Sequence, residues 1–157
     1  MRKNREKMQN GTYIVKSKII PEIAEKFCSD ETQSMFMEVM EEAIQLYKVE
    51  ISNFVVLNDE FQMVIKTIEE TDISVFMQWV KQVFSIRFNH RFNRNGTIWK
   101  GRFKSMLLKI KAEIMKFIKL IDNLPIRLNL CKEKEEYQYS GAWHIKNNIM
   151  SIIKNLP

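Results

Sequence analysis

Cationic side chains are concentrated in one quarter of the sequence, where they could contact the phosphates of a nucleic acid. Between Lys81 and Lys119 there are eleven Lys and Arg residues and a single acid, Glu113, so this segment has a net charge of +10. The whole chain of 157 residues has a net charge of +6, which leaves −4 for the remainder. A positive charge this concentrated attracts polyanions. The alternative interpretation is a solvated basic surface without a partner.

The cations of this segment fall into two groups by their spacing. The first group has intervals of four and three residues, which on a helix and its exit loop form one continuous positive edge made of Arg87, Arg91 and Arg94. The second group lies in residues 99–104, where cations alternate with uncharged residues. On a strand they would share one side at intervals of about 6.6–7 Å, close to the phosphate repeat of a nucleic-acid strand. These residues are Lys100, Arg102 and Lys104.

Two further features have both a functional and a structural interpretation. Trp99 could stack on an unpaired base, which is worth about 1–3 kcal/mol, or it could cap the core. Residues 1–11 form a basic arm with Arg2, Lys3 and Arg5. We expect this arm to be flexible, with reach into a groove of the nucleic acid as the alternative.

The order of elements predicts an α+β fold of the ferredoxin-like β-α-β-β-α-β type, an antiparallel sheet with helices packed on it and further helices at the C-terminus. Residues 1–157 form a single domain in this reading. The predicted strands are residues 13–15, 51–57, 61–66 and 103–110. The predicted helices are residues 30–48, 72–92, 112–122, which must end before Pro125, and 142–155. Residues 19–29 are expected to be irregular.

Several motifs together resemble one family. They are Met-Gln-Trp at residues 77–79, Phe88-Asn89, Gly96 and the run Trp99-Lys100-Gly101-Arg102-Phe103-Lys104-Ser105. This pattern resembles the single-tyrosine transposases of the HUH class, most closely the branch of REP-associated tyrosine transposases. The resemblance covers nearly the whole chain, from a first strand at residues 13–18 to a turn with Pro125. It implies binding of DNA, with Asn89 among the contact residues.

The resemblance also implies a chemistry that this sequence lacks the residues to perform. Such transposases cut single-stranded DNA at or near hairpins with a tyrosine hydroxyl, while two histidines flanking a hydrophobic residue hold Mg²⁺ or Mn²⁺. Here Glu60 and Gln62 stand where the histidines belong, and Leu120 stands where the tyrosine belongs. The catalytic residues are therefore expected to be degenerate, with no metal cofactor and no enzymatic strand transfer.

We therefore expect a DNA-binding protein that recognises a hairpin or duplex site and regulates by occupying it. One alternative is a metal-dependent nuclease or transposase that uses Glu60, Gln62 and Asp59 or Asp122, with Tyr137 or Tyr139 as a displaced nucleophile. An RNA-hairpin binder and a decaying copy without function are the others. Because no apolar run of membrane-spanning length occurs, we expect no membrane partner and a cytoplasmic location. The family includes dimers and monomers, which leaves a homodimer open.

Overall fold

Four antiparallel strands form one sheet in the order β2-β3-β1-β4. The structure is a computed structural model that describes residues 4–154. The strands are β1 (Thr12–Lys18), β2 (Val49–Val56), β3 (Glu60–Thr67) and β4 (Lys104–Leu108). This is the strand order of the β-α-β-β-α-β arrangement, so the predicted fold class is confirmed.

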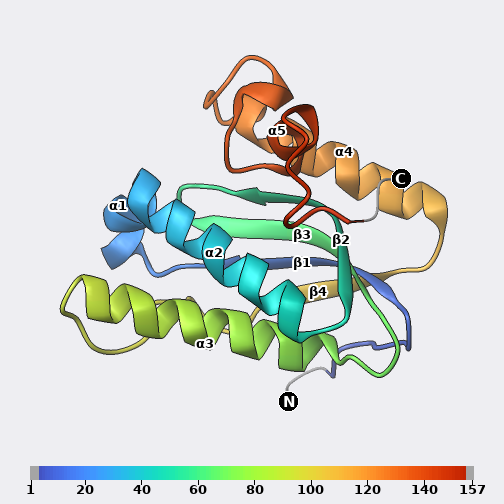
Figure 1. Ribbon diagram of the computed structural model, residues 1–157, viewed down its shortest axis with the longest axis horizontal. Coiled ribbons are helices and arrows are strands. Elements are labelled where there is room, and N and C mark those ends of the chain that lie inside the picture. The colour runs from blue at the N-terminus through green and yellow to red at the C-terminus, as the bar shows by residue number, and fades with distance from the viewer. Residues whose placement is uncertain (1–3, 155–157) are drawn as a thin grey trace.

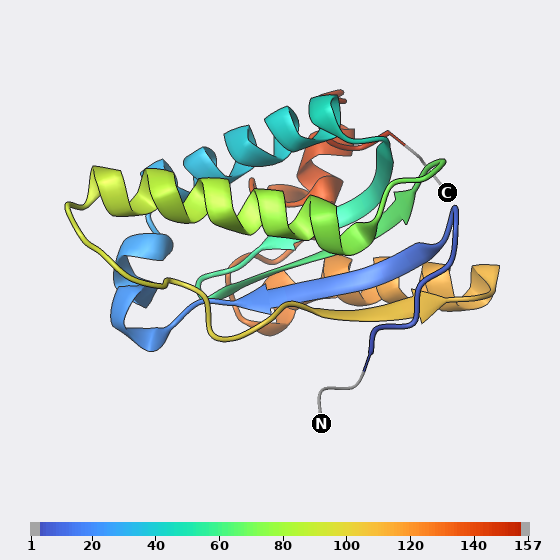
Figure 2. The same cartoon turned by 90° about the horizontal axis from the view of Figure 1, so that it is seen from below.

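Helices cover both faces of this sheet. α2 (Asp30–Leu46) and α3 (Ile73–Arg91) lie over one face, and α4 (Lys111–Arg127) lies over the other, as Figures 1 and 2 show. The two long helices α2 and α3 begin at side-chain caps, because Ser29 accepts a hydrogen bond from the Thr32 amide and Asp72 accepts one from the Ser74 amide. The shorter elements are η1 (Pro21–Ile23), α1 (Ala24–Phe27), η2 (Lys134–Glu136) and α5 (Gly141–Lys146).

The alternation of side chains along the strands divides the core into two clusters. In β1, Tyr13 and Val15 belong to the larger cluster, which includes the buried residues of α2 and α3. Ile14 points to the other face and packs in a smaller cluster with Ile118 and Ile121 of α4. Residues two apart on a strand therefore share a face. This alternation decides which polar side chains of the same strands lie on the α4 side.

Two helix predictions are wrong, and each has a local cause. α4 continues through the buried Pro125 to Arg127, where the Leu128 amide donates to the carbonyl of Leu124 at 3.1 Å and closes the last turn despite the amide donor that proline lacks. The last helix is α5, Gly141–Lys146, and not residues 142–155. It ends where Asn148 adopts a φ of +56°, after which Ile153 forms a parallel bridge with Ile51 of β2.

Two smaller predictions also need correction. β4 spans Lys104–Leu108 and is shorter at both ends than the predicted residues 103–110. Part of residues 19–29 is helical rather than irregular, in η1 and α1. Within residues 4–154, no helix is both long and apolar enough to cross a membrane.

Candidate nucleic-acid interface

α4 covers only part of its face of the sheet. It packs over Ile14 of β1, Val64 of β3 and Leu108 of β4. Further along the three strands, beyond the exposed Met106 of β4, the residues on the same face are polar and more accessible. Three of these polar residues are exposed lysines, and the other two, a glutamate and a glutamine, are half-buried. We call this part of the sheet the open face, and its residues are Lys16, Lys18, Glu60, Gln62 and Lys104.

The register of the strands places two lysines directly opposite each other on the open face. Lys16 of β1 pairs with Gln62 on one side and with Lys104 of β4 on the other. Lys18 pairs with Glu60. Side chains directly opposite in antiparallel strands have Cβ atoms about 4.5–5.5 Å apart, and like charges there are destabilising. An anion bound at the open face would relieve the repulsion between Lys16 and Lys104.

The segment before β4 brings two more cations to this place. The backbone amide of Lys100 donates to the carbonyl of Lys18 at 2.8 Å, and Trp99 forms a β-bridge with Ile19. Gly101 then turns the chain with a φ of +75°, a conformation that favours glycine. The result is a cavity of about 260 Å³. Its cationic lining, which we call the basic cluster, is Lys16, Lys18, Lys100, Arg102 and Lys104.

None of the members of the basic cluster forms an ion pair in the part of the chain that the structure describes, although Glu60 lies opposite Lys18 in the sheet. The prediction that Lys100, Arg102 and Lys104 alternate along one strand is wrong, since β4 begins only at Lys104. The structure nevertheless brings the three together around one cavity. The bend at Gly101, and not the alternation of side chains along a strand, brings these cations to one side.

The arginines of α3 have different surroundings. Both terminal nitrogens of the Arg87 guanidinium, Nη1 and Nη2, donate to the Glu42 carboxylate, at 2.9 and 2.7 Å. This hydrogen bond and the charge of Glu42 raise the pKa of Arg87. Arg91 donates to Glu31 in the same way. Because Glu31 and Glu42 lie on α2, these arginines join the two helices. Two of the three arginines of the predicted positive edge are therefore neutralised by the acids that face them.

Asn89 and Arg94 close the loop that follows α3. The Asn89 side-chain amide donates to the carbonyl of Gly96 at 2.8 Å, and its oxygen accepts from Arg94 at 2.9 Å. Both side chains are thus engaged within residues 89–96. This geometry gives them a role in shaping the loop that leads to the basic cluster.

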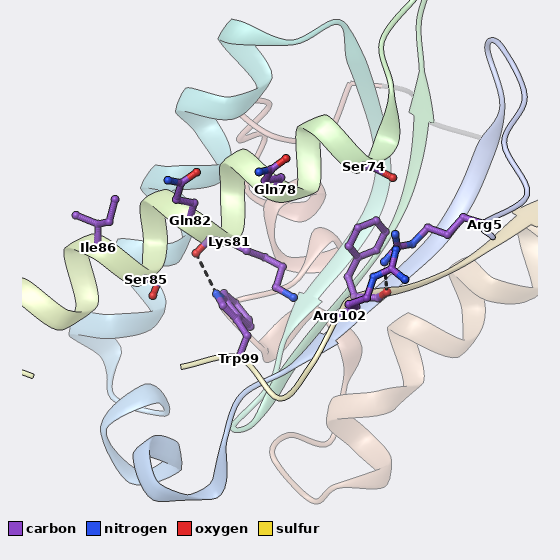
Figure 3. A pocket seen from close by; sticks show the side chains of 10 residues that line it. Arg5, Ser74, Gln78, Lys81, Gln82, Ser85, Ile86, Trp99 and Arg102 are labelled. Atoms are coloured by element: carbon purple, nitrogen blue, oxygen red, sulfur yellow. Dashed lines mark hydrogen bonds between the residues drawn. The ribbon is translucent and has the colours of Figure 1, made fainter. Parts of the chain in front are cut away.

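Trp99 is a core residue. Only 8% of it is exposed, and its ring contacts the rings of Phe61 and Phe84 at centroid distances of 5.8 Å. Its indole nitrogen donates to the carbonyl of Lys81 at 3.0 Å, the bond drawn in Figure 3. A ring held in this way cannot stack on a base without leaving the core. The interpretation of Trp99 as a core-capping aromatic fits the structure, and base stacking does not.

Part of the N-terminal arm lies against the domain. The Arg5 guanidinium donates to the carbonyl of Phe103 at 2.8 Å and lies 3.7 Å from the centroid of its ring. Lys7 pairs with Asp72 at 2.9 Å. These contacts place Arg5 close to Arg102. Arg2 and Lys3, the other two cations of the predicted arm, lie outside the described residues.

Sequence reasoning missed two members of the basic cluster, Lys16 and Lys18. A signal was available, because they follow Ile14 at intervals of two in the first strand and must share its face. What the sequence could not show is that β4 and the bend at Gly101 lie beside them.

Two of the three positions matched to the family's catalytic residues lie on the open face, and the third lies on α4. Glu60 and Gln62 point to the open face from β3, at the register positions opposite Lys18 and Lys16. Leu120 of α4 is 38% exposed. By helical spacing it lies on the flank of α4 opposite to Asp122, which bonds Asn53 of β2 at 2.9 Å.

The residues at these positions fit a divalent metal ion poorly. They supply one carboxylate and one amide, each directly opposite a lysine. Oxygen-bound Mg²⁺ or Mn²⁺ needs several oxygen ligands and little positive charge nearby. Within residues 4–154, no group of three or more His, Cys, Asp or Glu side chains could hold a metal ion.

The two tyrosines considered as displaced nucleophiles are engaged elsewhere. Tyr137 donates to the carbonyl of Val56 at 2.6 Å, and burial raises the pKa of Tyr137 to about 12. Tyr139 donates to the Asp30 carboxylate at 2.7 Å, and burial also raises the pKa of Tyr139. A tyrosine attacks as its phenolate, so a raised pKa opposes that role.

Comparisons with known proteins agree with this fold. A search of curated proteins finds no matching sequence. Among solved structures, a REP-associated tyrosine transposase bound to a REP hairpin superimposes with a TM-score of 0.78 at 15% identity, over 100% of this chain and 94% of that chain. A candidate transposase from Deinococcus radiodurans R1 gives a TM-score of 0.52 at 15% identity, over 76% of this chain and 97% of that chain. Residues 12–119, from β1 into α4, match the family described as Transposase IS200 like. The chain belongs to this IS200-like transposase family.

Proposed function

We propose that the chain is a transposase-derived DNA-binding protein that has lost strand transfer and acts by occupying its DNA site, as a regulator would. The observation that carries the proposal is the basic cluster, five cations at the open end of a sheet face that form no ion pair within residues 4–154. Contacts to phosphates supply most of the sequence-independent affinity of DNA-binding proteins. In this proposal the basic cluster supplies the affinity for DNA phosphates. Selection of bound DNA sequences identifies the base contacts.

A hairpin is the ligand that the comparisons favour. The REP-associated tyrosine transposase of similar fold is described as bound to a REP hairpin. We extend this ligand class to the present chain because its open face is concave and cationic rather than shaped for the insertion of a helix into a groove. A protein that works in this way would reside with the DNA in the cytoplasm.

The loss of strand transfer rests on chemistry. Leucine has no hydroxyl, so Leu120 cannot form the phosphotyrosine bond. Lys16 and Lys18 oppose a divalent cation at Glu60 and Gln62, as described above. Lysines at this place attract the same phosphates that a metal ion would attract, but they supply no nucleophile. Binding is retained in this proposal and cleavage is not.

The test compares binding with cleavage on the same substrates. Fluorescence anisotropy measures the affinity for DNA hairpins, RNA hairpins of the same sequence and linear duplexes. The variant Lys16→Met/Lys104→Met should lose affinity for DNA hairpins, whereas Lys132→Met/Lys146→Met, which removes the same charge from exposed positions near α5, should not.

Cleavage is followed on denaturing gels with Mg²⁺ or Mn²⁺. The proposal requires intact DNA and no covalent adduct. A cleavage product that the native chain forms and Glu60→Ala does not form would establish the nuclease alternative. A covalent adduct that is lost in Tyr137→Phe or Tyr139→Phe would identify the displaced nucleophile. Preference for the RNA hairpin would make the chain an RNA binder. Size-exclusion chromatography of the complex decides between monomer and homodimer.

A further inference from the structure

A second cationic cavity lies on another side of the molecule from the open face. It is a cleft of about 650 Å³ between α3 and residues 99–103, shown in Figure 3. This volume is in the range of sites that hold small ligands. The function proposed above does not use it, apart from Arg102, which lines both cavities.

The amine of Lys81 lies inside this cleft. It donates to the carbonyl of Gly101 at 3.1 Å and lies 5.1 Å from the centroid of the Trp99 ring. Figure 3 shows Lys81 extending from α3 toward Trp99. Burial and the charge of Arg5 lower the pKa of Lys81 to about 8. Neither of these two contacts supplies a full negative charge to the Lys81 amine.

Two arginines complete the cationic end of the cleft. Arg5 is held by its hydrogen bond to the Phe103 carbonyl and by its stacking on that ring. Burial and the charge of Arg102 lower the pKa of Arg5, so the cations repel one another. Among the described residues that line the cleft there is no acid, and the acid that acts on Arg5, Asp72, is already paired with Lys7. Three cations therefore line this end of the cleft, and no acid of residues 4–154 lines it with them.

The α3 side of the cleft also carries neutral polar residues. Besides Lys81 and the apolar Ile86, α3 contributes four residues at intervals of about one helical turn that can donate and accept hydrogen bonds. These residues are Ser74, Gln78, Gln82 and Ser85. Such a wall can bond the sugar or base attached to an anion, and it repels no phosphate.

We propose that this cleft is a binding site for a phosphate monoester, with the phosphate held by Arg5, Lys81 and Arg102 and the attached nucleoside against α3. Three cations match the two negative charges of a phosphate monoester better than the single charge of a diester. The phosphate has two sources, a free mononucleotide or the phosphorylated end of a nucleic-acid strand that lies on the open face and turns past Arg102.

The binding of thymidine monophosphate, inorganic phosphate and thymidine to the full chain tests the site by calorimetry. We expect the two phosphates to bind and thymidine not to. Lys81→Met should weaken both by about tenfold, the effect of losing one hydrogen bond between charged groups, and the matched control Lys146→Met should change neither. Arg5→Met should weaken binding as Lys81→Met does. Because Arg5 lies outside the sheet and helices, a loss of affinity shared by both variants is not explained by a folding defect of α3.

A pH series gives an independent readout on the unmodified chain. The charged groups facing Lys81 in the cleft are Arg5 from the N-terminal segment and Arg102 from the loop, and the other α3 residues that line it are uncharged. The phosphate is already a dianion at pH 7, with a second pKa of about 6. Affinity should therefore fall between about pH 7 and pH 9, where Lys81 loses its proton, and it should not fall in Lys81→Met.

Hairpins with and without a terminal phosphate separate the two sources. If the terminal phosphate raises the hairpin affinity of the native chain about tenfold, but not that of Lys81→Met, the site binds strand ends. If only the mononucleotide binds, the site takes free nucleotides. The inference is overturned if thymidine binds as well as its monophosphate, or if Lys81→Met leaves the affinities unchanged. Because the mononucleotide arm needs no DNA binding, its outcome is separate from that of the proposed function.

Discussion

Replacing Lys104 by Met should make the protein more stable and its DNA binding weaker at the same time. Lys104 and Lys16 lie directly opposite each other on adjacent strands, and neither has an acidic partner among the described residues. Removing one of two like charges at such a pair is worth about 0.2–1 kcal/mol. For a chain of this size that raises Tm by up to about 3 °C.

The effect on binding follows from the release of counter-ions. Each phosphate contact to duplex DNA contributes about 0.9 to the slope of log affinity against log salt, so the five cations of the basic cluster give a slope of about −4.5. Between about 50 and 200 mM salt, the native chain then loses about 500-fold in affinity. Lys104→Met should reduce the slope by about 0.9 and weaken binding about fivefold at 150 mM salt.

Circular dichroism melting and anisotropy titrations of a DNA hairpin at several salt concentrations measure both quantities. The control is Lys146→Met, an equal change of charge at an exposed position on α5 that should leave the salt slope unchanged. Lower stability in Lys104→Met would show that the repulsion between Lys16 and Lys104 is not present. An unchanged slope, or an equal loss in Lys146→Met, would refute the assignment of the basic cluster as the DNA contact.

Three other substitutions test separate parts of the account. Arg87→Met should leave hairpin affinity in anisotropy titrations unchanged, because Arg87 is paired with Glu42, and a clear loss would restore α3 to the interface. Tyr137→Phe should lower the free energy of unfolding in urea by about 1 kcal/mol, the value of its hydrogen bond to Val56, and should change no product on a cleavage gel. Burial lowers the pKa of His144 in the folded state, so the unfolded chain binds more protons and stability should fall as pH drops through about 6.5. The difference in unfolding free energy between His144→Gln and the native chain, measured by urea titration at several pH values, should shrink toward low pH, and a constant difference would show that His144 does not titrate.

Much of the fold could be predicted from the sequence because its signals are local. The alternation in residues 61–66 and the cap at Asp72 each depend on neighbours in the chain, and both were correct. The extent of α4 could not be predicted in this way. Pro125 indicates a helix end in the sequence, yet in the structure its side chain is buried and the helix continues to Arg127.

The candidate site could be predicted only in part, because electrostatic partners come from distant elements. Arg87 and Arg91 look like free cations in the sequence, and their acids lie on α2, at sequence separations of 45 and 60 residues. Lys100 and Arg102 were identified correctly as neighbours, although a bend at Gly101 brings them together and not a strand. Arg5 was assigned to the arm, and its position beside Lys81 appears only once the arm folds back over Phe103.

The most direct test is one binding reaction resolved on two gels. A labelled DNA hairpin pool, enriched by selection on the native chain, is incubated with the protein in Mg²⁺ and divided between a native and a denaturing gel. We predict a retarded complex on the first and an intact strand without attached protein on the second. A cut strand joined to the protein, or no retarded complex even at low salt, would contradict the claim that this chain holds DNA through its basic cluster and leaves it uncut.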